Sequence, residues 1–319
     1  MKYSNIPYVD KPASQLVYGC SGGPFARGED ASERLDAAYA NGVNFFDTAA
    51  VYGLSEVSVG SWIRKRGLED KVVLLSKCCH PAPDGARRVT EKELLFDFEQ
   101  FRTRSGLDYC DIYILHRDDP QVPVQMAVET LNRLHAEGKI GAFGGSNWTV
   151  RRLTEANEYA YSHNLLPFTV SSPNFSLAHQ LEDMWGGLSE TITGPEHQAD
   201  RDWYVKNQMP VIAHSALGHG LFSGRLKHTD LGTADQVLDQ FGMKGLAYEE
   251  NFERLGRCEA LAVKKGVTVA ELALAWVFRS PMNVFPVVST SSEERLKINI
   301  HAMELPLTDE ECAWLNLEA

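Results

Sequence analysis

The sequence predicts an α/β fold of the (β/α)8 or TIM barrel type, as a single domain over residues 1–319. Three observations lead to this prediction. Eight short apolar runs alternate with helical patterns, no linker or shift in composition divides the chain, and its length fits one large barrel. Two ordinary domains have the same total length, and periodicity alone leaves a doubly wound parallel sheet open.

The strand-like runs are short, apolar and often β-branched or aromatic, as strands buried on both faces of a parallel sheet are. They cover Leu16–Cys20, Val43–Phe46, Val72–Ser76, Asp111–Leu115, Ile140–Gly144, Phe168–Ser171, Pro210–Ala213 and Val284–Val287.

The helical segments between these runs have recognisable ends. Thr90–Ser105 starts with Thr-Glu-Lys-Glu, which matches a capping box, and Gly106 follows it. Asp30–Asn41 has apolar residues at helical spacing and stops before Gly42. Similar helical patterns cover Val124–Glu137, Leu153–His163 and Val269–Arg279.

Two long segments interrupt this alternation. Ser172–Asp202 is polar and contains several glycines, and Thr229–Ala247 is also long. Loops of this length often carry function, so both are candidates for covering a site. For Thr229–Ala247, a surface loop without a function is an equally open interpretation.

Composition excludes some classes of function. The formal net charge of −12 disfavours a nucleic-acid partner, because an acidic surface repels phosphate backbones. No apolar run approaches the roughly 20 residues that span a bilayer, and the first residues lack the apolar core of a secretory signal. We therefore expect a cytoplasmic protein with reduced cysteines. Cys78, Cys79 and His80 are too close in sequence to close a tetrahedral metal site by themselves, so no metal is expected.

Reactive side chains follow three consecutive predicted strands. Asp47 and Tyr52 follow the second strand, Lys77 the third and His116 the fourth. Barrel enzymes carry their reactive groups at these carboxyl ends. A phenol is a poor proton donor at neutral pH, but an ammonium group beside it stabilises the phenolate and lowers its pKa. The pattern therefore predicts acid–base chemistry at an oxygen atom.

Several motifs together resemble the aldo-keto reductase superfamily: FFDTAAVYG, LLSKC, DIYILHRDDP, GKIGAFGGSNW and SALGHGLFSG. The resemblance runs from Tyr18 to about Asn299. It implies a (β/α)8 barrel that binds a nicotinamide cofactor at the carboxyl ends of its strands. It also implies a catalytic tetrad of Asp47, Tyr52, Lys77 and His116, in which Tyr52 is the general acid and base.

The resemblance also implies where the cofactor binds, although the GxGxxG fingerprint is missing after the first strand. It places the carboxamide at Ser146 and Asn147, and it puts Ser172 and His214 where the family carries a glutamine and an aromatic ring. It assigns the diphosphate to Ser215, Leu217, Gly218 and Gly220, and the adenosine end to a segment that includes Ser289, Ser291, Arg295 and Asn299. The family favours NADP, and NAD stays possible because Ser291 stands where a basic residue is frequent.

The substrate expected from these features is a small carbonyl compound, an aldehyde or a ketone. Candidates for contacting it are Phe25, His80, Trp148 and Trp185, besides Tyr52 and His116 of the tetrad, and a place in the core is an equally open interpretation of Phe25 and Trp185. The polar run Arg117-Asp118-Asp119 favours a sugar-like substrate. Two other functions stay open: a nicotinamide-binding regulatory subunit like the potassium-channel β-subunits, and a lyase or epimerase that recycles its cofactor. The sequence fixes neither the reaction direction nor the oligomeric state.

Overall fold

A computed structural model describes residues 1–318 of the chain. Within these residues, eight strands close a barrel in the order β10-β3-β4-β5-β6-β7-β8-β9, and helices alternate with them along the chain. The predicted (β/α)8 barrel is therefore confirmed, and a doubly wound sheet is excluded. The barrel strands are β3 (Val17–Gly19), β4 (Phe45–Asp47), β5 (Val73–Cys78), β6 (Cys110–Leu115), β7 (Ile140–Ser146), β8 (Val170–Ser172), β9 (Val211–Ala213) and β10 (Val284–Val288).

Helices follow most of these strands. They are α1 (Pro24–Arg27), α2 (Ser32–Ala40), α3 (Ser55–Arg66), α4 (Glu91–Ser105), α5 (Val124–Ala136), α6 (Val150–Ser162), α7 (Gln198–Asn207), α8 (Gln240–Leu246), α9 (Glu249–Lys265), α10 (Val269–Phe278), α11 (Glu293–His301) and α12 (Asp309–Leu315). None of the helices in the described part of the chain combines the length and the apolar character that a bilayer span needs.

The described residues group into two compact units. The N-terminal unit, Lys2–Ser172, carries β3 to β8, and the C-terminal unit starts at Pro173 and carries β9 and β10. The assignment of one domain to the whole chain stays a prediction.

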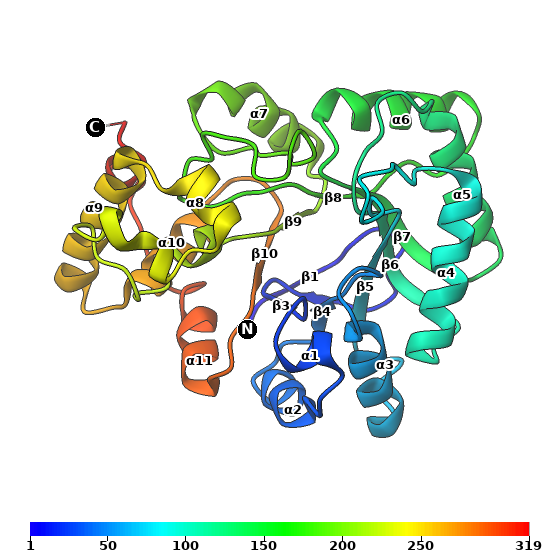
Figure 1. Cartoon of the computed structure of the whole chain (residues 1–319), viewed down its shortest axis with the longest axis horizontal. Helices are drawn as coiled ribbons and strands as arrows, with labels where there is room; N and C mark the ends of the chain where they lie inside the picture. Colours follow the sequence, from blue (N-terminus) through cyan, green and yellow to red (C-terminus); the bar gives the residue numbers. More distant parts are fainter. Residues whose placement is uncertain (319) are drawn as a thin grey trace. The chain divides into compact units, whose positions relative to one another are not determined.

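In the N-terminal unit, successive strands pair in parallel. Asp47 of β4 lies opposite Leu75 of β5, and Lys77 of β5 lies opposite Ile114 of β6. Helices α2 to α6 cover the outer side of these strands (Figure 1). Buried aromatic side chains join strands to helices: Phe46 of β4 contacts Trp62 of α3, and Tyr113 of β6 contacts Phe98 and Phe101 of α4. This packing fixes the carboxyl ends of β4, β5 and β6 relative to one another.

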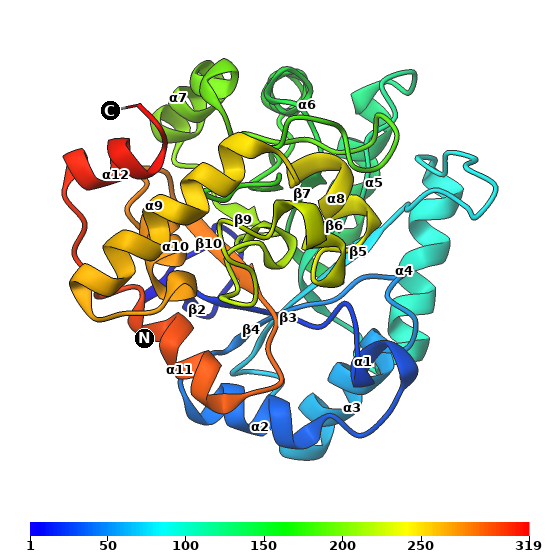
Figure 2. The ribbon, with the colours of Figure 1, turned by 60° about the vertical axis from the view of Figure 1, so that its left-hand side comes forward.

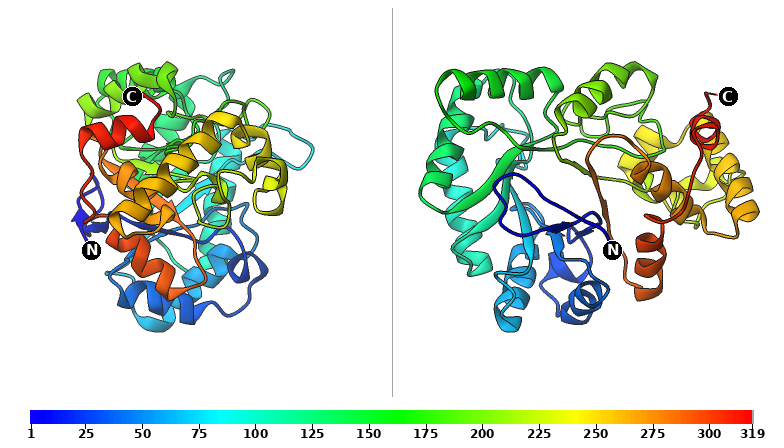
Figure 3. Two further views of the ribbon diagram at one scale, coloured as in Figure 1. Left: turned by 90° about the vertical axis from the view of Figure 1, so that its left-hand side faces the viewer. Right: turned by 180° about the vertical axis from the view of Figure 1, so that it is seen from behind.

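In the C-terminal unit, β9 and β10 pair in parallel, with Val211 opposite Val284. Helix α9 packs beside α10 (Figure 2) and also contacts α12, which is red in Figure 3. The capping box of α10 is complete, because the Thr268 hydroxyl accepts from the amide of Glu271 and the Glu271 carboxylate accepts from the amide of Thr268.

The structure differs from the sequence predictions mainly at boundaries and in the long segments. Strand β5 continues to Cys78, so Lys77 lies inside the strand and not beyond its end. The segment 229–247 contains α8, which the Asp239 carboxylate caps and which carries two glycines that weaken the sequence signal. The segment 172–202 includes the start of α7, a mostly polar helix whose few apolar residues gave no clear helical period.

Candidate active site

Asp47 and Lys77 form a buried ion pair in the N-terminal unit. The Lys77 ammonium donates to the Asp47 carboxylate and to the carbonyl of Thr48, at 3.0 Å from the latter. The side chain of Lys77 is only 4% exposed and that of Asp47 only 8%. Burial raises the pKa of the Asp47 carboxyl, although the charge of Lys77 acts to lower it. Burial acts to lower the pKa of the Lys77 amine, but the interactions with Asp47 and Tyr52 outweigh burial and raise this pKa. The Lys77 amine therefore stays charged.

Tyr52 lies against the same ammonium group. Lys77 Nζ is 3.4 Å from the Tyr52 hydroxyl and 4.7 Å from the centre of its ring. The sequence predicted that this charge lowers the pKa of the phenol, and it does act in that direction. Burial of the hydroxyl outweighs it, and the pKa of Tyr52 is raised. At neutral pH the side chain is therefore a phenol that carries its proton.

His116 completes a group of three rings. Its ring centre is 5.5 Å from that of Tyr52 and 4.9 Å from that of His80, in edge-to-face arrangements. His116 is 6% exposed. The His80 ring interacts with the carbonyl of Pro81, and burial lowers the pKa of this imidazole. The site thus offers two imidazoles beside one phenol.

Backbone hydrogen bonds at the strand ends set this geometry. The amide of His116 donates to the carbonyl of Cys78, and the amide of Ala50 donates to that of Lys77. Tyr52 sits on a tight turn that Gly53 continues with a φ of 58°. A Cβ at Gly53 would lie 2.4 Å from the carbonyl oxygen of Ala26, so only glycine fits there.

Two further ion pairs hold the loops that carry His80 and His116. Asp97 accepts hydrogen bonds from the amide of Cys79 and from the Arg88 guanidinium. Arg152 forms a bidentate pair with the carboxylate of Asp118. Asp97, Arg88 and Arg152 were not among the predicted residues, because nothing in the sequence pairs residues on separate helices and loops. Asp118 was expected only as part of a polar run that favours a sugar-like substrate, whereas in the structure its carboxylate is paired with Arg152.

A family model described as "Aldo/keto reductase family" matches residues 18–316, which is most of the chain. The chain belongs to the aldo/keto reductase family. The predicted resemblance is thereby confirmed, and membership of this family makes the protein an oxidoreductase by class.

Several curated proteins resemble this chain over most of their length. An aldo-keto reductase of Strobilurus tenacellus is 27% identical, over 88% of this chain and 78% of that protein. An uncharacterized oxidoreductase of Bacillus subtilis is 26% identical, over 99% of this chain and 95% of that protein. A probable voltage-gated potassium channel subunit beta of Oryza sativa is 25% identical, over 96% and 92%.

Three of the residues expected at the cofactor meet in the N-terminal unit. The Ser146 hydroxyl donates to the carbonyl of Ser172, at 2.9 Å. The Asn147 side chain donates to the Ser146 hydroxyl and to the carbonyl of His116, and Asn147 adopts a φ of 57°. The structure thus links Ser146, Asn147 and Ser172 to each other and to the tetrad through His116.

Another expected group lies on the loop after β9 in the C-terminal unit. His214 and Ser215 contact each other through Nδ1 and Oγ at 3.2 Å. After Leu217, Gly218, His219 and Gly220 all have positive φ, of 58°, 50° and 104°. Consecutive amides in such conformations can form an anion-binding concavity.

The segment expected at the adenosine end includes the start of α11. Ser289, Ser291 and Arg295 are exposed, and Asn299 is 4% exposed. Lys297 pairs with Glu293 at 2.9 Å. The Arg295 guanidinium has no partner among the described residues, so it is the cation of this helix that is open to a ligand.

The residues expected to contact substrate lie in different environments. Trp148 is 1% exposed, packs on Phe168 and lies under the Arg152 guanidinium, so its position indicates packing. Phe25 is 4% exposed. Trp185 is partly exposed, and its ring contacts those of His214, His219 and Phe241 in the C-terminal unit.

Proposed function

We propose that this aldo/keto reductase interconverts a carbonyl compound and an alcohol with NADP(H), and that Tyr52 is its general acid and base. One observation carries the proposal: the Lys77 ammonium contacts both the Asp47 carboxylate and the Tyr52 hydroxyl, with the His116 ring beside them. Such a group has no evident purpose in a purely structural barrel, since burying charges is costly.

The residues divide the work at the substrate oxygen. In reduction, the Tyr52 hydroxyl donates its proton to the carbonyl oxygen, and the Lys77 ammonium stabilises the phenolate that results. Asp47 keeps Lys77 charged and in place. His116 donates a hydrogen bond to the same substrate oxygen. In oxidation, the phenolate takes the proton of the alcohol.

The donor groups fit a nicotinamide cofactor. When bound, the cofactor supplies or accepts the hydride. Ser146, Asn147 and Ser172 bring hydroxyl and amide groups together, as a carboxamide requires. The positive-φ run from Gly218 to Gly220 suits the diphosphate. Arg295, with its open guanidinium, would hold the 2′-phosphate and select NADP over NAD.

Because its pKa is raised, Tyr52 carries its proton at neutral pH, which is the form that carbonyl reduction needs. A protonated phenol is ready to donate, whereas oxidation first needs the phenolate. We expect the rate of alcohol oxidation to rise as the pH is raised above neutral, because a larger fraction of Tyr52 is then present as phenolate.

The test is turnover of a panel of aldehydes, ketones and sugars with NADPH and with NADH. We expect NADPH-dependent reduction that disappears in Tyr52→Phe. The likeness to a probable potassium channel subunit beta favours one second candidate, a regulatory subunit that binds the cofactor. Tight NADPH binding without turnover of any substrate in the panel would favour that candidate.

A further inference from the structure

The C-terminal unit contains a groove that shares no residue with the candidate active site. Its volume is about 480 Å³, within the range of small-molecule sites. Residues of α7, α10 and α12 line it; these three helices are labelled in Figure 2. The groove therefore has the size of a ligand site and a lining that the proposed reaction does not use.

One wall of the groove is aromatic. The rings of Phe175 and Trp276 are 5.4 Å apart, with an interplanar angle of 34°. Trp276 is partly exposed, whereas Phe175 is buried. Trp276 Nε1 donates to the carbonyl of Cys312, so the polar atom of the indole is already engaged. What Trp276 offers to the groove is apolar ring surface.

Arg201 of α7 supplies a cation at the same groove. Its Nη1 donates to the carbonyls of Ile192 and Gly194, at 2.8 and 2.6 Å, and its Nη2 donates to the side-chain oxygen of Gln198. All three acceptors are neutral. A guanidinium has five N–H groups, so the Nε–H and one Nη2–H of Arg201 have no partner among the described residues.

No carboxylate of the described residues comes within ion-pair distance of Arg201. Burial lowers the pKa of this guanidinium, and Glu318 and Asp202 oppose that effect only from a distance. Neutral partners and two unused donors compensate only poorly for the free-energy cost of half-burying the positive charge of Arg201. A ligand carboxylate would provide charge-assisted hydrogen bonds to both donors.

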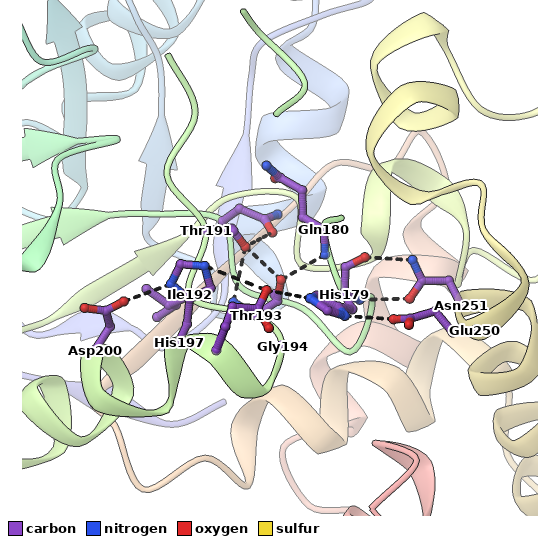
Figure 4. A network of polar contacts seen from close by, with 12 residues as sticks. His179, Gln180, Thr191, Ile192, Thr193, Gly194, His197, Asp200, Glu250 and Asn251 are labelled. Carbon is purple, nitrogen blue, oxygen red and sulfur yellow. Dashed lines mark hydrogen bonds and ion pairs between the residues drawn. The ribbon is translucent and has the colours of Figure 1, made fainter. Parts of the chain in front are cut away.

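The backbone that orients Arg201 is firmly held. The Thr191 and Thr193 hydroxyls lie 2.8 Å apart, and the amide of Gln180 donates to Thr193 (Figure 4). The amide of Ile192 donates to the carbonyl of Asn174. The carbonyls of Ile192 and Gly194 therefore keep the guanidinium in place before a ligand arrives, which lowers the entropic cost of binding.

The rim of the groove limits the charge of its ligand. Arg279 is paired with Asp309 at 2.8 Å, and both side chains are largely exposed. Asp202 and Glu318 are exposed as well. Solvent screens these rim acids more than it screens Arg201, but they oppose a second negative charge. One carboxylate with an apolar remainder fits this distribution.

We propose that this groove binds a small amphipathic monoanion, an arylalkyl carboxylate, with its carboxylate on Arg201 and its aromatic ring against Trp276. The probes are phenylacetate and indoleacetate, with phenylacetamide as the neutral match of the first. Calorimetric titration of the full chain should show saturable binding of the carboxylates and at least about 10-fold weaker binding of the amide.

Arg201→Gln should weaken carboxylate binding by about 10- to 100-fold. Arg279→Gln is the matched control, because it removes an arginine of the same groove that is exposed and already paired, and it should change affinity by less than about 3-fold. Ala313→Trp fills the groove from α12 without removing a contact of Arg201, and it should abolish binding. Carbonyl reductase activity should not change in any of the three variants.

Four results would overturn the proposal. They are no saturable binding of either carboxylate up to about 10 mM, equal affinity for acid and amide, equal losses in Arg201→Gln and Arg279→Gln, and undiminished binding in a folded Ala313→Trp variant. The last result would place the bound carboxylate elsewhere, for example at the candidate active site.

Discussion

Lys77 in the N-terminal unit and Arg295 in the C-terminal unit are both cations of the proposed enzyme, but their surroundings are opposite. Lys77 is 3% exposed, and its ammonium contacts Asp47, Thr48 and Tyr52. Arg295 is exposed, and its guanidinium has no partner among the described residues. The difference matches the two roles that we propose: a cation that stabilises a phenolate is fixed before the substrate binds, whereas a cation that selects a charged ligand is left open for it.

The largest effect is expected from removing the hydroxyl that Lys77 contacts. Tyr52→Phe keeps the ring and removes the hydroxyl, so kcat should fall on the order of 10²–10⁴-fold while the Kd of NADPH hardly changes. Steady-state kinetics and fluorescence titration of the cofactor measure the two quantities. Tyr113→Phe, which removes another buried hydroxyl of the same unit, should leave kcat within about 3-fold. Substantial turnover by Tyr52→Phe would take the acid–base role away from Tyr52.

Removing the fixed cation should affect both stability and pH dependence. Lys77→Met leaves the Asp47 carboxylate buried without its partner, which should cost about 3–5 kcal/mol of unfolding free energy. Loss of the ammonium also raises the pKa of Tyr52 further, so the rise of alcohol oxidation with pH should move to higher pH. Urea unfolding and a pH–rate profile test these effects.

Lys139 provides the control for this variant, because it pairs with Glu137 at 2.8 Å on the surface. Lys139→Met should cost no more than about 1 kcal/mol and should leave the pH–rate profile unchanged. Equal losses of stability in the two variants would contradict the contrast between a fixed cation and an exposed one.

The role of Arg295 is tested by measuring the binding of NADPH and NADH. Arg295→Ala should weaken NADPH binding by about 1.5–3 kcal/mol and leave NADH binding nearly unchanged, because only NADPH carries the 2′-phosphate. Lys297→Ala is the matched control on the same helix, since Lys297 is already paired with Glu293, and it should change neither affinity. If both cofactors lose equally in Arg295→Ala, Arg295 does not select NADP.

The smallest effect concerns a fixed anion of the C-terminal unit. Asp183 is partly buried, which raises its pKa, but hydrogen bonds from Ser189, Gly187 and Trp185 outweigh burial and lower it. Because the pKa of Asp183 is lower in the folded protein than the unfolded value of 3.8, its ionised carboxylate stabilises the fold at every pH above 3.8. This stabilisation is lost only as the pH falls through the folded pKa.

Asp183→Asn should therefore cost about 1 kcal/mol at pH 7, and the same difference should persist down to about pH 4. Thermal unfolding at several pH values measures it. A difference that disappeared already near pH 6 would show that another group carries the effect.

The sequence was sufficient for the residues at or just after the carboxyl ends of strands and insufficient for those that support them. Asp47, Lys77 and His116 could be placed together because parallel strands bring their carboxyl ends to one edge. The Asp97–Arg88 and Asp118–Arg152 pairs could not, because each joins a helix and a loop whose approach only packing decides. Trp148 illustrates the same limit, since its type fits a substrate wall but its burial depends on Phe168 and Arg152.

The groove at Arg201 could not be foreseen for a related reason. Trp276 and Arg201 lie far apart in sequence, and the polar helix α7 was not predicted at all. The net charge of −12 also disfavours an anion site. Net charge is a sum over the whole chain, so it cannot reveal a single half-buried guanidinium such as that of Arg201.

The turn at Gly53 also bears on how this enzyme could diversify. Its backbone lies so close to the carbonyl oxygen of Ala26 that any side chain at Gly53 would require the turn that carries Tyr52 to shift. Random libraries that vary Gly53 should therefore mostly return variants in which the contact between Tyr52 and Lys77 is disturbed. In the proposed enzyme, new substrate preferences are best sought outside this turn, with Gly53 kept constant.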